Sequence, residues 1–484
     1  MKALARLIGT ILFGVLTHLS AAAQECPGAH CSAKSDAINK VCIAQGQSGN
    51  LVFVEHPAGT GQYCYCRCSC LPPDTPVAIA GGKWQELGKL KVGDSVLALQ
   101  KDGTWKTAQV VFSDGTTQPK KPIPYAIYLT TSNGTSFVTT ADHAFLLADM
   151  KTLRRADRLQ PNDQLVNAET MKPLGITKLY SGSYLGPMHN IAATGWNATD
   201  DQWGHLINTK GVVSADYFAQ INLVRDDAQT EPQVGSDEYI KRFASFKALA
   251  SAPKEIKLGR SGKFIPHKRL KIPADAISFL EPGQDIAAAG KLHPLDYTVP
   301  FEMAQYLTNH YQRFYPQIVF HVEWQDDRVN AFAWMQGSTR HVAILGGLVR
   351  HRAIQLEGAG LVLAHETGHH FGGNPRYASG NTWASCEGQS DYWGAAVAQR
   401  TVWWGADALD KTKRGADQLY DLFANGLMMG NLIEISKRSP PAAAPLGICS
   451  HPPAYCRQDT YMAAIRLDPK PACAGDPPSL IQKK

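Results

Sequence analysis

The run His365-Glu366-Thr367-Gly368-His369 brings two imidazoles and a carboxylate close together in the sequence. Residues four positions apart lie on the same face of a helix, so the rings of His365 and His369 can reach one metal ion. Zinc commonly takes histidine nitrogen as a ligand. Glu366 points a little further around the helix, where it could take a proton from a water molecule activated by the metal. The spacing therefore predicts a zinc site with His365 and His369 as ligands and Glu366 as the general base.

A zinc site that does chemistry needs a third protein ligand and an open fourth position. Glu387 follows His369 by eighteen residues, a distance that lets a second helix return across the first. Asp391 lies four residues further on, on the same face of that second helix. We expect Glu387 to be the third ligand. We expect Asp391 to accept a hydrogen bond from the second ring nitrogen of His365 and so fix its tautomer.

The segments around these residues are typical of an α+β domain over residues 261–484. The apolar run Leu361–Ala364 precedes the motif, as in a helix buried inside a domain. Gly372-Gly373 and Pro375 mark the end of this helix. Periodicity predicts helices at Glu302–Phe314, Leu356–Phe371 and Asp391–Trp404. It also predicts a hairpin whose strands are Asn330–Trp334 and His341–Leu345.

The motif followed by Glu387-Gly388-Gln389-Ser390-Asp391 resembles the gluzincin metallopeptidases, which carry HExxH and a downstream Glu-xxx-Asp helix. Asn330-Ala331-Phe332 and Gly346-Gly347-Leu348 also resemble the group that contains the HtpX-type and CAAX prenyl proteases. The resemblance implies a zincin-type fold, Zn2+ as cofactor and hydrolysis of a peptide or protein substrate. It further implies that the strand at Asn330–Trp334 pairs with an extended substrate. The shorter gap before Glu387 and the lack of membrane helices indicate a soluble relative.

Other interpretations of this region stay open. The histidines could hold a structural or inactive zinc ion, or no metal at all. Cys386 could be a fourth thiolate ligand, although export would favour a disulfide. Residues near the motif that could stabilise an oxyanion are Tyr392, His370 and Arg400, and the sequence does not distinguish them.

A second chemistry could start at Cys70, at the beginning of a block of short strands. Apolar or β-branched runs alternate there with turns such as Asp102-Gly103 and Asn133-Gly134, which predicts an all-β domain over residues 70–222. The expected strands are Val77–Ala80, Ser95–Leu99, Tyr125–Thr130, Ser136–Thr139, His189–Ala193 and Val212–Ser214.

Three phrases of this block, Cys70–Val77, Gly88–Val96 and Thr139-Thr140-Ala141-Asp142-His143, resemble the Hint domain of hedgehog autoprocessing proteins and inteins. The resemblance implies an N-to-S acyl shift, in which the Cys70 thiol attacks the carbonyl of Ser69 and a thioester replaces the peptide bond. Thr140 and His143 match the positions that distort the amide and protonate its nitrogen.

The end of the block departs from inteins, because Gly211–Tyr217 lacks a terminal His-Asn followed by Cys, Ser or Thr. His189-Asn190 precedes Ile191 and fits an internal strand. We therefore expect hydrolysis of the thioester and release of the N-terminal piece, not ligation. His205 could assist this step or be a packed core histidine. Alternatively, Cys70 only completes the alternation of Cys64, Cys66 and Cys68 along one strand face, for disulfides or a metal.

The chain begins with the features of an export signal over residues 1–23. Lys2 and Arg6 precede the apolar run Leu7–Leu16 and the small-residue site Ala21-Ala22-Ala23. A membrane anchor is the alternative, but this run is shorter than the about 20 residues that span a bilayer. We expect a secreted or periplasmic protein with no stable membrane insertion once the signal is removed.

Eleven cysteines in an exported chain favour disulfides. The seven upstream cysteines lie in or directly after a Cys-rich segment over residues 24–69, and their odd number leaves one thiol, which we expect to be Cys70. The downstream cysteines could form two bridges; they are Cys386, Cys449, Cys456 and Cys473.

The predicted order is therefore signal peptide, Cys-rich segment, Hint-like all-β domain, linker over residues 223–260 and zincin-type metallopeptidase domain. The linker contains a candidate short helix at Asp237–Ala250. A formal net charge of +6 is too slight to indicate a nucleic-acid partner, and the oligomeric state is not indicated. Two other functions stay open: a non-catalytic surface or interaction protein with degenerate enzyme domains, and a self-processing effector that delivers the peptidase as cargo.

Overall fold

The computed structural model describes residues 51–55, 62–66, 71–115, 122–197, 199–224, 230–249, 254–258, 260, 262–281, 283, 292–426 and 449–475. The predictions for the signal peptide and for Ser69 and Cys70 lie outside these ranges. Of the Cys-rich segment, the structure describes the antiparallel strands β1 (Leu51–Glu55) and β2 (Gln62–Cys66). Among the described residues, no helix is both long and apolar enough to cross a membrane.

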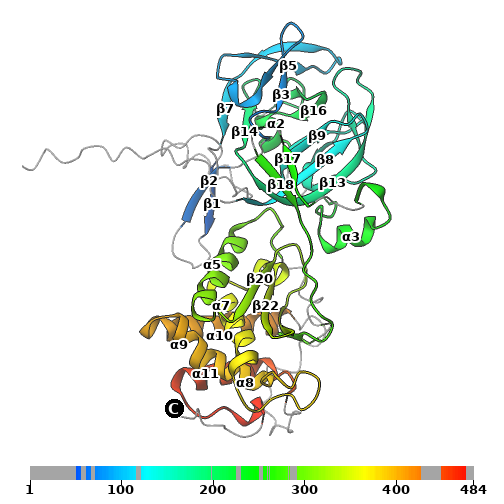
Figure 1. Ribbon diagram of the computed structural model, residues 1–484. Helices are drawn as coiled ribbons and strands as arrows, with labels where there is room; N and C mark the ends of the chain where they lie inside the picture. Colours follow the sequence, from blue (N-terminus) through cyan, green and yellow to red (C-terminus); the bar gives the residue numbers. More distant parts are fainter. Residues whose placement is uncertain are drawn as a thin grey trace, which may run out of the picture.

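The middle block is built of strands, as its alternating pattern predicts, and only the short helix α2 (Tyr217–Asn222) closes it (Figure 1). Its two larger sheets share a core that includes Val77, Ile127 and Leu129. Gly134, in the predicted Asn133-Gly134 turn between β8 and β9, has a φ of +85°. The strands are β3 (Pro76–Ile79), β4 (Lys83–Glu86), β5 (Ser95–Leu99), β6 (Trp105–Gln109), β7 (Phe112–Gly115), β8 (Ile123–Thr131), β9 (Ser136–Thr140), β10 (Ala144–Leu146), β11 (Leu153–Arg155), β12 (Gln164–Val166), β13 (Pro173–Leu185), β14 (His189–Ala192), β15 (Leu206–Thr209) and β16 (Val212–Ala215).

The segment expected to be a linker contains ordered elements that join the middle block. Helix α3 (Asp237–Phe243) begins after Ser236, whose side chain accepts a hydrogen bond from the Tyr239 backbone. Strands β17 (Ile256–Leu258) and β18 (Gly262–Pro266) form a hairpin, and β18 pairs with β13. The expected boundary after residue 260 therefore falls inside this hairpin. Strands β17 and β18 are too short to show a clear hydrophobic period. Packing of buried Phe264 against Tyr128 fixes the hairpin on the middle block.

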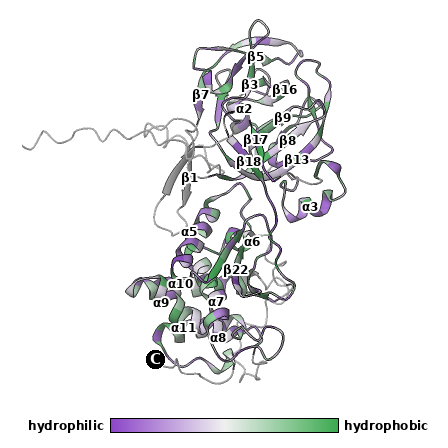
Figure 2. Ribbon diagram, in the orientation of Figure 1, coloured by the Kyte–Doolittle hydropathy of each residue, from purple (hydrophilic) through white to green (hydrophobic). Residues whose placement is uncertain are grey.

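The C-terminal part combines a small sheet with helices, which agrees with the predicted α+β character. The sheet order is β19 (Ile277–Ser278), β21 (Ala331–Gln336), β22 (Thr339–Leu345) and β20 (Ile318–Glu323), with β20 and β22 parallel. Helix α7 (Leu356–Phe371) contacts this sheet, and strand β22 beside it is strongly hydrophobic (Figure 2). The helices are α5 (Val299–Phe314), α6 (Gly346–Arg350), α7 (Leu356–Phe371), α8 (Glu387–Trp393), α9 (Gln399–Val402), α10 (Gly405–Gly426) and α11 (Ala454–Arg466).

Strand β21 is not the open edge that the sequence predicts for substrate pairing. Ile277 and Ser278 of β19 pair with Ala333 and Phe332, and the Phe279 N–H donates to the Ala331 carbonyl at 3.0 Å. The prediction that Asn330–Trp334 offers a free strand edge is therefore wrong, because a segment of the same chain takes those hydrogen bonds. A two-residue strand has no periodicity from which this pairing could be predicted.

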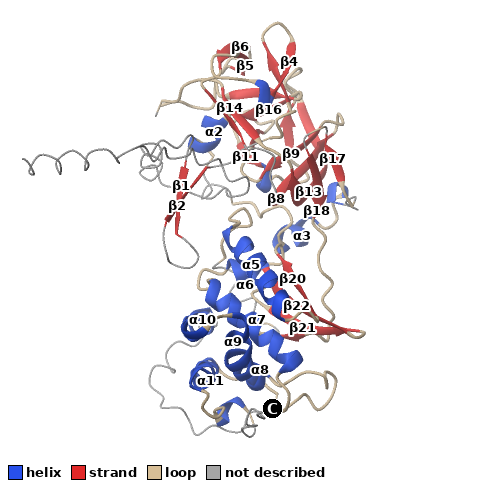
Figure 3. Ribbon diagram, turned by 60° about the vertical axis from the view of Figure 1, so that its left-hand side comes forward, coloured by secondary structure: helices blue, strands red, loops and turns tan. Residues whose placement is uncertain are grey.

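The middle block packs directly on the α+β domain, and the two lie one above the other in the side view (Figure 3). Arg155, in β11, donates to Asp157 at 2.8 Å and also pairs with Asp296 of the C-terminal part. Gln233 donates to both carboxylates, at 2.7 and 3.1 Å. All four side chains are buried. A guanidinium shared by two buried carboxylates thus holds the two domains together.

We predict that Arg155→Met lowers the free energy of unfolding by about 3–5 kcal/mol, because it removes the buried cation that Asp157 and Asp296 share. Urea unfolding followed by tryptophan fluorescence measures this change. The control is Lys413→Ala, which removes an exposed i,i+4 pair with Asp417 and should change stability by about 0.5 kcal/mol or less. A loss below about 1 kcal/mol in Arg155→Met would contradict the assigned role.

Candidate metal centre

Three side chains from two neighbouring helices meet at one point in the C-terminal domain. His365 and His369 come from α7, and Glu387 begins α8. The two Nε2 atoms are 3.1 Å apart, His365 Nε2 is 3.3 Å from Glu387 Oε2, and His369 Nε2 is 3.6 Å from Glu387 Oε1. All three residues are fully buried, and their ligand atoms lie within 4.8 Å of one another. The structure thus brings together the three predicted ligands.

Close contact between α7 and α8 makes this meeting point possible. Gly368 lies inside the motif, and a Cβ at this position would come within 2.7 Å of the Ser390 carbonyl oxygen. Any side chain here would push the two helices apart. The glycine between the histidines is therefore needed so that Glu387 can approach both rings.

His365 is held by a buried network around Asp391. His365 Nδ1 lies 2.7 Å from Asp391 Oδ1, so its N–H donates there and Nε2 faces Glu387. Burial acts to lower the pKa of His365, but Asp391 outweighs it and raises that pKa to about 9, so a metal would bind at Nε2 by displacing a proton. Arg457 donates to both carboxylate oxygens of Asp391, at 2.9 and 2.7 Å, and the Tyr461 hydroxyl donates to Oδ1 at 2.6 Å. Burial alone would raise the pKa of Asp391, but Arg457 and His365 outweigh it and hold that pKa well below its usual range. Asp391 is therefore an anion at neutral pH.

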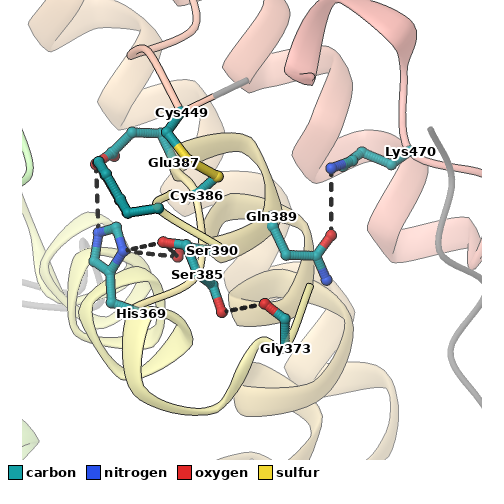
Figure 4. The surroundings of a disulfide bond; sticks show 10 residues. His369, Gly373, Ser385, Cys386, Glu387, Gln389, Ser390, Cys449 and Lys470 are labelled. Carbon is teal, nitrogen blue, oxygen red and sulfur yellow. Dashed lines mark hydrogen bonds and ion pairs between the residues drawn. A yellow bond between two sulfur atoms is a disulfide. The ribbon is translucent and has the colours of Figure 1, made fainter. Parts of the chain in front are cut away.

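His369 is oriented by a different partner, a backbone carbonyl. Its Nδ1 donates to the Ser385 carbonyl at 2.8 Å, and the Ser390 hydroxyl is 3.0 Å from the same nitrogen (Figure 4). Burial lowers the pKa of His369 to about 4, so the ring is neutral at physiological pH. A neutral imidazole whose Nδ1 carries the proton presents an unprotonated Nε2, the form that binds a metal.

Glu366 lies beside these ligands with both carboxylate oxygens buried and, among the described residues, without a hydrogen-bond partner. Burial raises its pKa to about 8. A buried carboxyl group without a partner is unusual, because such groups normally find a donor or a cation. The orphaned Glu366 oxygens and the donor set of two imidazoles and one carboxylate fit a zinc ion with an open coordination position.

Four further side chains complete the site, and the sequence reasoning missed all of them: Tyr377, His451, Arg457 and Tyr461. The Tyr377 hydroxyl donates to Glu387 Oε1 at 2.8 Å. His451 Nε2 is 3.5 Å from Glu387 Oε2 and donates to the Ser278 carbonyl at 2.8 Å. His451, Arg457 and Tyr461 belong to the C-terminal tail. The cysteines beside them, Cys449 and Cys456, were the available sign that this tail returns to the domain.

The three residues named as possible oxyanion donors are engaged elsewhere. His370 Nε2 donates to the His341 carbonyl at 3.0 Å, and its ring stacks on Trp383. Tyr392 and Arg400 donate to backbone carbonyls of the C-terminal tail, at 2.6 Å each. Cys386 forms a disulfide with Cys449, so the thiolate-ligand alternative for Cys386 is excluded. A second disulfide joins Cys456 and Cys473.

The middle block places two of its predicted catalytic residues at the end of β9. Thr140 donates from its hydroxyl to Asp142 at 2.9 Å, and His143 is buried with its ring edge-on to Phe145. Leu71, which follows Cys70, exchanges two backbone hydrogen bonds with His189, at 3.1 and 2.7 Å. The chain directly after Cys70 is therefore anchored to β14, which also fits the expected internal strand at His189-Asn190.

His205 has a specific partner and is not only packed in the core. Its Nδ1 lies 3.1 Å from Asp216 Oδ2, and its ring contacts Trp196. Burial acts to lower the pKa of His205, but the Asp216 carboxylate outweighs it and raises that pKa.

No family model matches the chain, and no curated protein matches it. Among solved structures, the chain is similar to a bacterial intein-like domain from Clostridium thermocellum, with 18% identity, 31% of this chain and 98% of that chain covered, and a TM-score of 0.25. It is also similar to a DnaB intein from Synechocystis sp. PCC 6803, with 15% identity, 31% and 98% coverage and a TM-score of 0.24. The gp41-1 intein gives 18% identity, the same coverages and a TM-score of 0.24. Each of these matches covers 31% of this chain.

We predict that Asp391→Asn weakens zinc binding by about 10- to 100-fold, because the amide no longer fixes the His365 tautomer or neutralises Arg457. Competition with a chromophoric zinc chelator measures the affinity. Asp410→Asn, which alters an exposed carboxylate on α10, is the matched control and should bind zinc like the wild type. Equal affinity in the Asp391 variant would show that the network does not serve a metal.

Proposed function

We propose that this chain is an exported zinc metallopeptidase that carries a self-processing Hint-like domain. One observation carries the peptidase proposal: His365, His369 and Glu387 present three metal-binding atoms within 4.8 Å of one another, next to the orphaned carboxyl of Glu366. A structural zinc site would close its fourth position with a protein ligand. Here the Cys386 sulfur is consumed by a disulfide, which favours an open, catalytic site.

A zinc ion bound there would polarise a peptide carbonyl and make a water molecule more acidic. The role of Glu366 follows from its burial. Its carboxyl is buried beside the metal ligands and, among the described residues, has no hydrogen-bond partner, so it is placed to accept a proton from a water molecule bound there. Glu366 would hold the proton of the attacking water and later give it to the departing amine.

We predict that Glu366→Gln lowers kcat for hydrolysis of a denatured protein by about 10²- to 10⁴-fold while zinc content stays near one ion per chain, because the amide is isosteric but cannot accept the proton. A fluorogenic casein assay and metal analysis of the same sample give both values.

The matched control is Asp410→Asn, in which an exposed carboxylate is replaced by its amide. Retention of wild-type activity by Glu366→Gln would refute Glu366 as the base. If the wild type holds no zinc after dialysis against a zinc buffer, the peptidase proposal itself is wrong.

The middle block supports a second activity, cleavage of the Ser69–Cys70 bond by an acyl shift. The anchoring of Leu71 on β14 fixes the chain just after this bond, and Thr140 and His143 lie buried at the end of β9. In the proposed step the Cys70 sulfur bonds to the Ser69 carbonyl carbon, the peptide C–N bond breaks, and His143 protonates the nitrogen. Water then hydrolyses the thioester and restores the thiol.

We predict that the purified chain yields an N-terminal fragment ending at Ser69, that Cys70→Ala abolishes this fragment, and that His143→Ala slows its appearance by at least about 10²-fold. Intact-mass spectrometry with and without hydroxylamine measures the cleavage. His370→Ala, outside the middle block, should cleave like the wild type. An uncleaved wild-type chain after hydroxylamine treatment would contradict the proposal.

A further inference from the structure

The C-terminal tail supplies much of the outer layer of the metal centre. His451 reaches Glu387, and Arg457 and Tyr461 reach Asp391 across 66 and 70 residues of sequence. Lys470 donates to Gln389 of α8 at 3.3 Å (Figure 4). The backbone at Ala474 approaches Gly388 so closely that no Cβ would fit there. Helix α8, which carries the ligand Glu387, is therefore enclosed by the tail.

The Cys386–Cys449 disulfide is the covalent link between this tail and the ligand. Cys386 directly precedes Glu387, is fully buried, and donates from its backbone N–H to the Pro375 carbonyl at 2.9 Å. On the other side, Cys449 is two residues before His451. One bond thus ties the start of the ligand helix to the segment that carries His451. The Cys456–Cys473 disulfide, in contrast, joins two positions of the tail to each other, with a sequence separation of 17.

We propose that Cys386 and Cys449 are positioning residues, and that their disulfide sets the metal affinity of the centre by holding the tail against the start of α8, where Glu387 lies. The oxidised chain retains zinc, and the reduced chain holds it weakly, so the peptidase becomes competent only after oxidation. The inference rests on the proposed peptidase function.

Two groups of contacts explain why this bond acts on the metal and not only on stability. Glu387 Oε1 is set by Tyr377, and Oε2 faces His365 and His451. Without the bond, His451 and the start of α8 lose their covalent link, although Arg457 and Tyr461 still hold α11 on Asp391. Loss of the partners that orient metal ligands typically weakens metal binding by about 10- to 100-fold.

The oxidation step balances as a thiol–disulfide exchange. The two thiols of Cys386 and Cys449 lose two electrons and two protons when their sulfurs bond. A protein disulfide of an oxidising compartment accepts both and becomes a dithiol. No metal takes part in this step.

The test compares two disulfides of the same tail. We expect Cys386→Ser with Cys449→Ser to raise the zinc dissociation constant by about 10- to 100-fold. We expect Cys456→Ser with Cys473→Ser to lower the melting temperature but to change the zinc dissociation constant by less than about threefold. Both are measured on the full chain with zinc alone, by competition with a chromophoric chelator, and each melting temperature is recorded in excess chelator.

A second variant covers the case in which buried serines prevent folding. Cys386→Val with Cys449→Ala fills the buried volume without the bond, and wild-type chain reduced with a phosphine opens both disulfides of the tail without mutation. We expect the same weakening in both. Wild-type zinc affinity in either, or an equal loss in the Cys456 and Cys473 variant, would overturn the positioning role. A wild-type chain that binds no zinc would instead overturn the proposed function, so the two failures are distinguishable.

Discussion

The arrangement of the C-terminal domain depends on one buried anion, the carboxylate of Asp391. It is fully buried, and it receives hydrogen bonds from His365, Arg457 and Tyr461. Moving a charge from water into the interior is costly unless partners surround it. The buried Asp391 anion is therefore stabilised by the Arg457 cation of α11, and buried Arg457 is stabilised by Asp391 in turn. The same interaction orients a ring of α7. One carboxylate thus couples the motif helix, the ligand helix and the tail.

This coupling has a counterpart between the domains. Arg155 lies between Asp157 and Asp296, and Gln233 donates to both carboxylates, so the middle block and the C-terminal domain are joined through buried polar groups. Buried polar groups specify one arrangement of the two domains more strictly than apolar contacts do, because a shifted interface would leave these groups without hydrogen-bond partners. Strand β18 also connects the two domains. It pairs with β13 in the sheet of the middle block, and the chain that follows it leads to β19 in the sheet of the C-terminal domain.

Local patterns in the sequence were enough to predict that His365, His369 and Glu387 meet, and to predict the character of both domains. The spacing of His365, His369 and Glu387 encodes two crossing helices, and alternation of apolar residues encodes the strands of the middle block. What could not be predicted depends on distant contacts. His451 and Arg457 act on residues more than sixty positions away, and no local period reports that. Strand β19 has only two residues, so its place beside β21 is decided by packing of Phe279 against His365 and Arg457.

The path of the tail also determines where the chain can be divided. A shortened form ending with α10 would keep HExxH, Glu387 and Asp391, and by sequence motif it would count as a whole catalytic unit. It would nevertheless bury the Asp391 carboxylate without the Arg457 cation and the Tyr461 hydroxyl, because both lie beyond the cut. The smallest fragment expected to fold on its own must therefore include Arg457, which neutralises Asp391, and must extend to the last residues that enclose α8.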